Sequence, residues 1–80
     1  MKSTSLTPAD QIIVLRAALR LLEIGHVQQA HVDLCEAIKE TPPEAPAYAA
    51  MVGAANWIDP LNQPIQARIE IAKALITLDN

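Results

Sequence analysis

His31 and Cys35 are the residues of this sequence best suited to chemistry. They lie four positions apart, and in a helix that spacing places two side chains on one face. Such a pair could give two ligands to a zinc ion, or an imidazole that activates a thiol as a nucleophile. Structural zinc sites are usually four-coordinate, however, and the chain has only one further histidine, His26, and no second cysteine. We therefore expect no metal site and no cofactor, with Cys35 serving as a small, half-buried apolar residue.

Other patterns that enzymes use are equally weak. Glu36 and Glu40 share a helical face, but Lys39 nearby indicates that this side of the helix is in water. The two glycines are far apart in the sequence, so they form no phosphate-binding loop. No third group is matched to His31 to orient it as a base. We expect no catalytic residues and no enzymatic activity.

Charge and hydropathy exclude two classes of partner. Six basic and nine acidic residues give a net charge of −3, and no segment gathers the Lys and Arg that phosphate binding requires. Arg16 and Arg20 interrupt the longest apolar stretch, so no membrane span is expected. A single cysteine is typical of a reducing compartment. The sequence therefore predicts a cytoplasmic protein that binds neither nucleic acid nor membrane.

Proline and glycine divide the chain into four helical segments. Thr7, Pro8 and Asp10 form a helix start signal, and Gly25 is suited to the left-handed turn that ends a helix. Prolines at 42 and 43 should end the next helix, and Pro46 fits the first turn of a third. We expect helices over about 8–24, 26–40, 45–56 and 64–78, with a compact loop over 57–63.

The short connections favour antiparallel packing. We predict an all-α fold of four short helices in two antiparallel hairpins, forming one domain over residues 1–80 with a flexible N-terminal tail at 1–6. Phenylalanine is absent and the aromatic residues are Tyr48 and Trp57, so the core must be aliphatic. The third helix is rich in alanine and glycine, which lets neighbouring helices approach it closely.

One segment resembles a known repeat family. Small and large residues follow the spacing of a tetratricopeptide repeat, a helical hairpin of about 34 residues: Gly25, Val27, Ala30, Leu34, Ala37, Pro42 and Tyr48. The resemblance covers one repeat, about 11–44, and the first helix of a second. It implies a peptide- or protein-binding role. One repeat is too short for a stacked core, so the last helix would act as a cap or a second copy would complete the stack.

The first and last helices carry more apolar surface than so short a chain can bury. We therefore predict a non-enzymatic protein–protein interaction module, such as a small adaptor, chaperone-like protein or inhibitor, that self-associates as a homodimer or binds another protein. The expected partner-binding residues are Tyr48, Trp57, Ile71, Leu75 and Leu78. The alternative is a structural homo-oligomer that binds a small ligand between its subunits.

Overall fold

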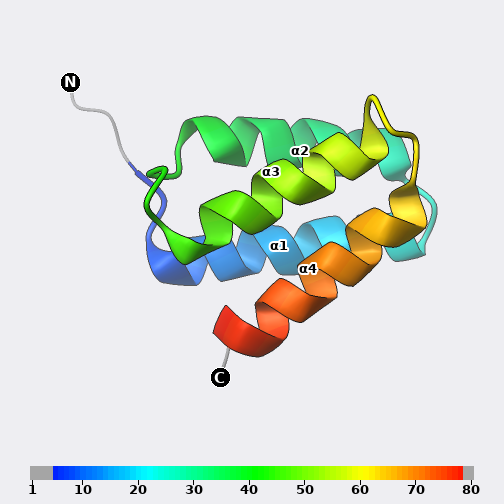
Figure 1. Ribbon diagram of the computed structural model, residues 1–80. Helices are drawn as coiled ribbons and strands as arrows, with labels where there is room; N and C mark the ends of the chain where they lie inside the picture. Colours follow the sequence, from blue (N-terminus) through cyan, green and yellow to red (C-terminus); the bar gives the residue numbers. More distant parts are fainter. Residues whose placement is uncertain (1–4, 79–80) are drawn as a thin grey trace.

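The computed structural model describes residues 5–78, and within this range the protein is all-α. Its four helices are α1 (Pro8–Glu23), α2 (Val27–Lys39), α3 (Pro46–Ile58) and α4 (Pro64–Leu78). Figure 1 shows that successive helices run in opposite directions, which confirms the two antiparallel hairpins. Among residues 5–78, no helix is both long and apolar enough to cross a membrane.

Both ends of α1 follow the sequence signals closely. The Thr7 side-chain oxygen accepts a hydrogen bond from the Asp10 backbone N–H over 3.1 Å, which caps α1. Pro8 occupies the first turn. Gly25 has φ +92°, the left-handed conformation in which a Cβ is strained. Two chemically specified ends thus fix where α1 begins and where the first hairpin turns.

The loop between α3 and α4 is shorter than expected. The predicted loop began at Trp57, but α3 continues to Ile58, so Trp57 is helical. Asp59 is extended, with φ −150° and ψ 120°, because the residue before a proline avoids helical geometry and Pro60 follows it. Asn62, at φ 55°, then takes a left-handed conformation that brings the chain round to α4.

The helices form two layers, α1 with α2 and α3 with α4 (Figure 1). Helices α2 and α3 pack together across the layers, and so do α1 and α4, whereas α1 and α3 lie diagonally and touch less. The last helix therefore closes the arrangement by covering the first.

The core is built from aliphatic and mostly small side chains. Its buried apolar residues come from all four helices: Leu15, Ala18, Leu22, Ala30, Leu34, Ala37, Ala47, Ala50, Met51, Ala54, Ala55, Ile58, Ala67 and Ile71. Two polar residues are also buried, Gln11 and Thr41. The Gln11 side-chain amide donates to the Leu6 carbonyl oxygen over 2.9 Å. Residues 1–4 of the predicted flexible tail at 1–6 lie outside the described residues. Leu6, which belongs to the same predicted tail, is held in place by this hydrogen bond.

Candidate functional site

Helix α4 has one packed side and one open side. Ala67 and Ile71 are fully buried against the rest of the protein. The opposite side carries Ile65, Ile69 and Ile76, which are 65%, 46% and 71% exposed. These three residues and Ala72, which is half-buried, share a face at helical spacing. We call Ile65, Ile69, Ala72 and Ile76 the isoleucine stripe.

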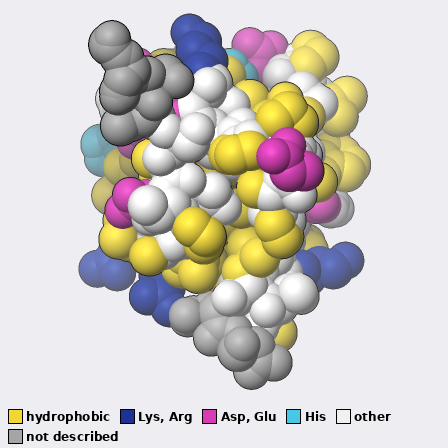
Figure 2. All heavy atoms as spheres, turned by 90° about the vertical axis from the view of Figure 1, so that its left-hand side faces the viewer, with side chains coloured by type: hydrophobic (Ala, Val, Ile, Leu, Met, Phe, Trp, Pro, Cys, Tyr) yellow, Lys and Arg dark blue, Asp and Glu magenta, His cyan; other side chains and the backbone are white. Residues whose placement is uncertain are grey.

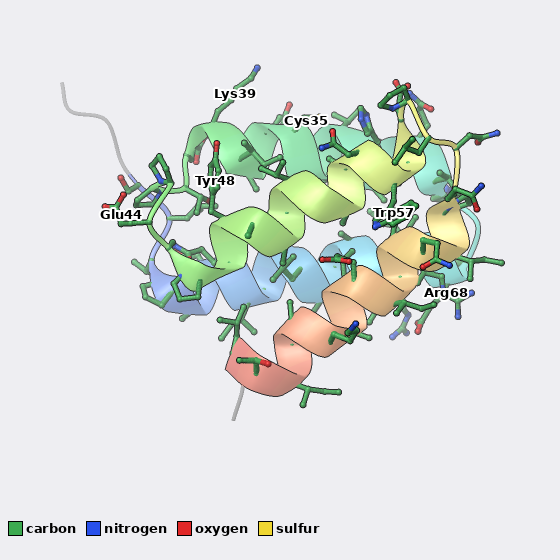
Figure 3. All side chains as sticks on the ribbon, viewed as in Figure 1. Cys35, Lys39, Glu44, Tyr48, Trp57 and Arg68 are labelled. Carbon is green, nitrogen blue, oxygen red and sulfur yellow. The ribbon has the colours of Figure 1, made fainter. Side chains whose placement is uncertain are left out.

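Basic side chains border the isoleucine stripe. At about 100° of rotation per residue, Arg68 and Lys73 fall on either side of Ile69. Both are exposed, and Figure 3 shows Arg68 at the outer side of α4. Glu70 is the acidic residue of α4, and its side chain lies against Gly53 of α3. The accessible side of α4 is therefore apolar with a basic border.

A second apolar surface lies between α1 and α2. It is an open groove of about 280 Å³ lined by Leu6, Ile13, Val14, Ala17, Asp33, Glu36, Ala37 and Glu40. We call this the α1–α2 groove. Helix α1 contributes three of the apolar residues, of which Ile13 is 60% exposed, and Leu6 and Ala37 supply the others. Asp33 and Glu36 of α2 and its C-cap residue Glu40 supply three carboxylates, so one side of the groove is acidic, and no basic residue among residues 5–78 lines it.

Local structure sets the shape of the α1–α2 groove. The Leu6 backbone N–H donates to the Glu40 carbonyl oxygen over 2.8 Å, which holds the N-terminal segment against the last turn of α2 and closes one end. Asp33 accepts a hydrogen bond from the Gln29 side chain over 2.9 Å. Both hydrogen bonds join groove residues to other residues of the same chain. The groove is therefore present in a single copy of the protein.

A third hollow lies at one end of the bundle, where α1 begins and α4 ends. It measures about 480 Å³. Its lining is mainly apolar and combines residues from three parts of the chain: Leu6, Pro8, Gln11, Ile12, Pro42, Glu44, Ala45, Pro46 and Leu78. Figure 2 looks at this end and shows hydrophobic side chains gathered across it, with Lys and Arg toward the edges. Among the described residues, Glu44 is the one charged residue of this lining.

The structure separates the residues that the sequence grouped as a partner surface. Ile71 is 0% exposed, so we correct its assignment: it belongs to the core and offers no surface to a partner. Trp57, Leu75 and Leu78 are half-buried and pack against the core. Tyr48 is also half-buried and lies near the start of α3, far along that helix from Trp57 (Figure 3). A partner-binding role for these four stays a prediction.

Two features of the α1–α2 groove are not predicted from the sequence. The first is the exposed position of Ile13, whose spacing places it on the same side of the helix as Ala17. Asp33, Glu36 and Glu40 follow the spacing of a single helical face, and the sequence predicts that this face is in water. That periodicity is a signal for an acidic stripe. Only the packing of α1 beside α2 places the stripe next to apolar side chains.

His31 and Cys35 lie side by side on α2, as their spacing predicts. The Cys35 Sγ atom is 3.7 Å from Nε2 and 3.9 Å from Nδ1 of His31. Cys35 is half-buried and packs against the core. No group of three or more His, Cys, Asp or Glu side chains suited to a metal ion occurs among residues 5–78. The pair therefore has the geometry of two neighbouring side chains in contact at the edge of the core.

Comparison with known proteins gives no relative: no family model, curated protein or solved structure matches this chain.

Proposed function

We propose that this chain is a non-enzymatic protein-interaction module that binds another protein chain through the isoleucine stripe of α4. The observation that carries the proposal is the exposure of Ile65, Ile69 and Ile76 on one side of a helix whose other side is fully packed. Single exposed apolar residues are ordinary on protein surfaces, but aligned ones form a continuous contact surface.

Covering the isoleucine stripe would stabilise a complex. Burying an isoleucine side chain that was exposed contributes about 1.5–3 kcal/mol. Three partly exposed isoleucines in a row therefore offer several kcal/mol to a partner that covers them. That gain is comparable to the free energy of unfolding of a small domain, which is roughly 5–15 kcal/mol. Association with a protein surface is the simplest way to realise it.

Further support comes from the first hairpin. Gly25 takes the left-handed turn, while Ala30, Leu34 and Ala37 are buried at the positions where the tetratricopeptide pattern needs close packing. We interpret residues 11–44 as a hairpin of that type with α4 as its cap, which agrees with a protein-binding role. We also propose a cytoplasmic location, which rests on the single thiol of Cys35.

The test compares the wild-type protein with Ile69→Asp, and uses Val32→Asp as the matched control. Val32 is an exposed apolar residue on α2, outside both surfaces. Sedimentation over a range of concentrations measures self-association, and affinity capture from the native cells measures binding to other proteins. We expect the wild type and Val32→Asp to form the same complexes and Ile69→Asp to lose them. Complexes that survive Ile69→Asp, or a wild type that forms none, would overturn the proposal.

A further inference from the structure

We infer that the partner of the isoleucine stripe is the α1–α2 groove of a second copy of this chain, giving a head-to-tail assembly. The inference rests on the proposed function, because it takes the stripe as the binding surface and names its occupant. It follows from two surfaces of the same protein that complement each other in hydropathy and in charge. No residue belongs to both surfaces.

The apolar parts of the two surfaces match. The stripe is a convex row on one helix, with Ile65, Ile69 and Ile76 exposed. The groove is a concave surface between two helices, and its apolar lining residues are Leu6, Ile13, Val14, Ala17 and Ala37. A helix that lays its apolar side into a groove between helices is a common mode of protein recognition.

The charges match as well. Arg68 and Lys73 border the stripe, whereas Asp33, Glu36 and Glu40 line the acidic side of the groove. Arg68 and Lys73 lie on opposite borders of the stripe and the groove is acidic on one side, so placing the stripe in the groove brings one of the two basic side chains toward the carboxylates. Opposite charges across an interface set its orientation and discourage other partners.

Pairing the stripe with itself is less favourable. Two copies of α4 would bring Arg68 and Lys73 of each chain together, and like charges across an interface are repulsive. The one carboxylate of α4 does not offset this. Glu70 is half-buried, and its Oε2 atom lies 3.3 Å from the position that a Cβ on Gly53 would occupy, so it faces α3 within its own chain.

A contact between two different surfaces does not close after one pairing. Each added copy leaves a stripe free at one end of the assembly and a groove free at the other. Such an interface produces rings or open chains rather than a closed dimer. The wild-type protein should therefore grow in steps as its concentration rises.

The experiment mixes two variants, each of which has lost one surface. Ile69→Asp disables the stripe and keeps the groove. Ile13→Lys disables the groove, because it places a charge in the apolar lining that the isoleucines of the next copy must contact, and it keeps the stripe. Val32→Asp and Val32→Lys are the matched controls outside both surfaces. Circular dichroism verifies that every variant is folded, and sedimentation velocity measures the size of each variant alone and of the equimolar mixture.

We expect each variant alone to be monomeric, with self-association weakened by about thirtyfold or more, as for a central interface residue. The mixture should form a one-to-one pair and stop there, because the remaining surfaces are disabled. Both controls should assemble like the wild type. As a second variant, Glu36→Lys should weaken wild-type assembly by about five- to tenfold, since it turns an attraction into a repulsion.

Three results would contradict the inference, and they separate it from the proposed function. If Ile13→Lys assembles like the wild type, the groove is not the partner surface, although the stripe remains one. If purified wild type stays monomeric but captures another protein through Ile69, the module binds a foreign partner only. If Ile69→Asp assembles like the wild type, the inference and the proposed function both fail.

Discussion

Ile69 and Ile71 lie two residues apart on α4 and occupy opposite environments: Ile71 is fully buried, whereas Ile69 is 46% exposed. Truncation of each side chain to alanine should therefore change the free energy of unfolding by different amounts. Ile71→Ala removes packed methyl groups from the core and is expected to lower the free energy of unfolding by about 2–4 kcal/mol. Ile69→Ala should change it by less than about 0.5 kcal/mol in dilute solution, where the stripe is uncovered. Urea denaturation measures both. Equal losses would mean that α4 is rotated from the orientation described.

Gly25 is needed for its backbone conformation. No heavy atom outside its neighbours lies within 4 Å of the position a Cβ would take, so there is space for a side chain, but φ is +92°. A β-branched residue resists that geometry, and we expect Gly25→Val to cost about 1 kcal/mol or more. The measurement is the midpoint of chemical denaturation. An unchanged midpoint would show that the first hairpin turns elsewhere.

Folding should not depend on a metal ion. His31 and Cys35 supply two adjacent ligands, and His26, the N-cap residue of α2, is the other histidine. Two or three such groups on one short segment do not complete a closed site. We expect the thermal melting temperature to be the same with and without chelator. A fall of more than about ten degrees would contradict this, because a structural zinc contributes directly to folding.

Thr41 is a buried polar residue at the end of α2. Its hydroxyl donates to the Ala37 carbonyl oxygen over 2.6 Å and lies 3.5 Å from the Met51 sulfur. Thr41→Val keeps the shape and removes the hydrogen bond, so it should cost about 1 kcal/mol. Thr77→Val is the control, since the Thr77 hydroxyl donates to the Lys73 carbonyl oxygen at 3.4 Å in an exposed position. Chemical denaturation measures the free energy of unfolding of both variants. Equal losses would show that burial does not increase the contribution of the Thr41 hydrogen bond to stability.

The helix ends were largely predictable because they depend on local backbone chemistry. Thr7, Gly25 and the prolines act through hydrogen bonding and allowed dihedral angles, which neighbouring residues determine. The end of α3 was misplaced by two residues, although Asp59 followed by Pro60 carries the relevant signal. The all-α fold and its aliphatic core followed from the same punctuation and from the absence of phenylalanine.

The binding surfaces were less predictable because they depend on how each helix is rotated. Isoleucines occur on more than one side of α4, so hydropathy alone does not decide whether Ile69 or Ile71 faces the core. The packing of α4 against both α1 and α3 decides it. The α1–α2 groove likewise depends on the packing of two helices. Only that packing brings Ile13 of α1 into the same groove as Glu36 and Glu40.

Isoleucine-methyl NMR during dilution tests the central claim most directly, because it reports on each isoleucine separately. The claim is that the isoleucine stripe contacts another copy of the chain. We expect the methyl signals of Ile65, Ile69 and Ile76 to shift as the concentration rises, while those of the buried Ile58 and Ile71 stay in place. If the three stripe signals do not move up to about 1 mM, where even weak association of about 4 kcal/mol is detectable, the account is contradicted.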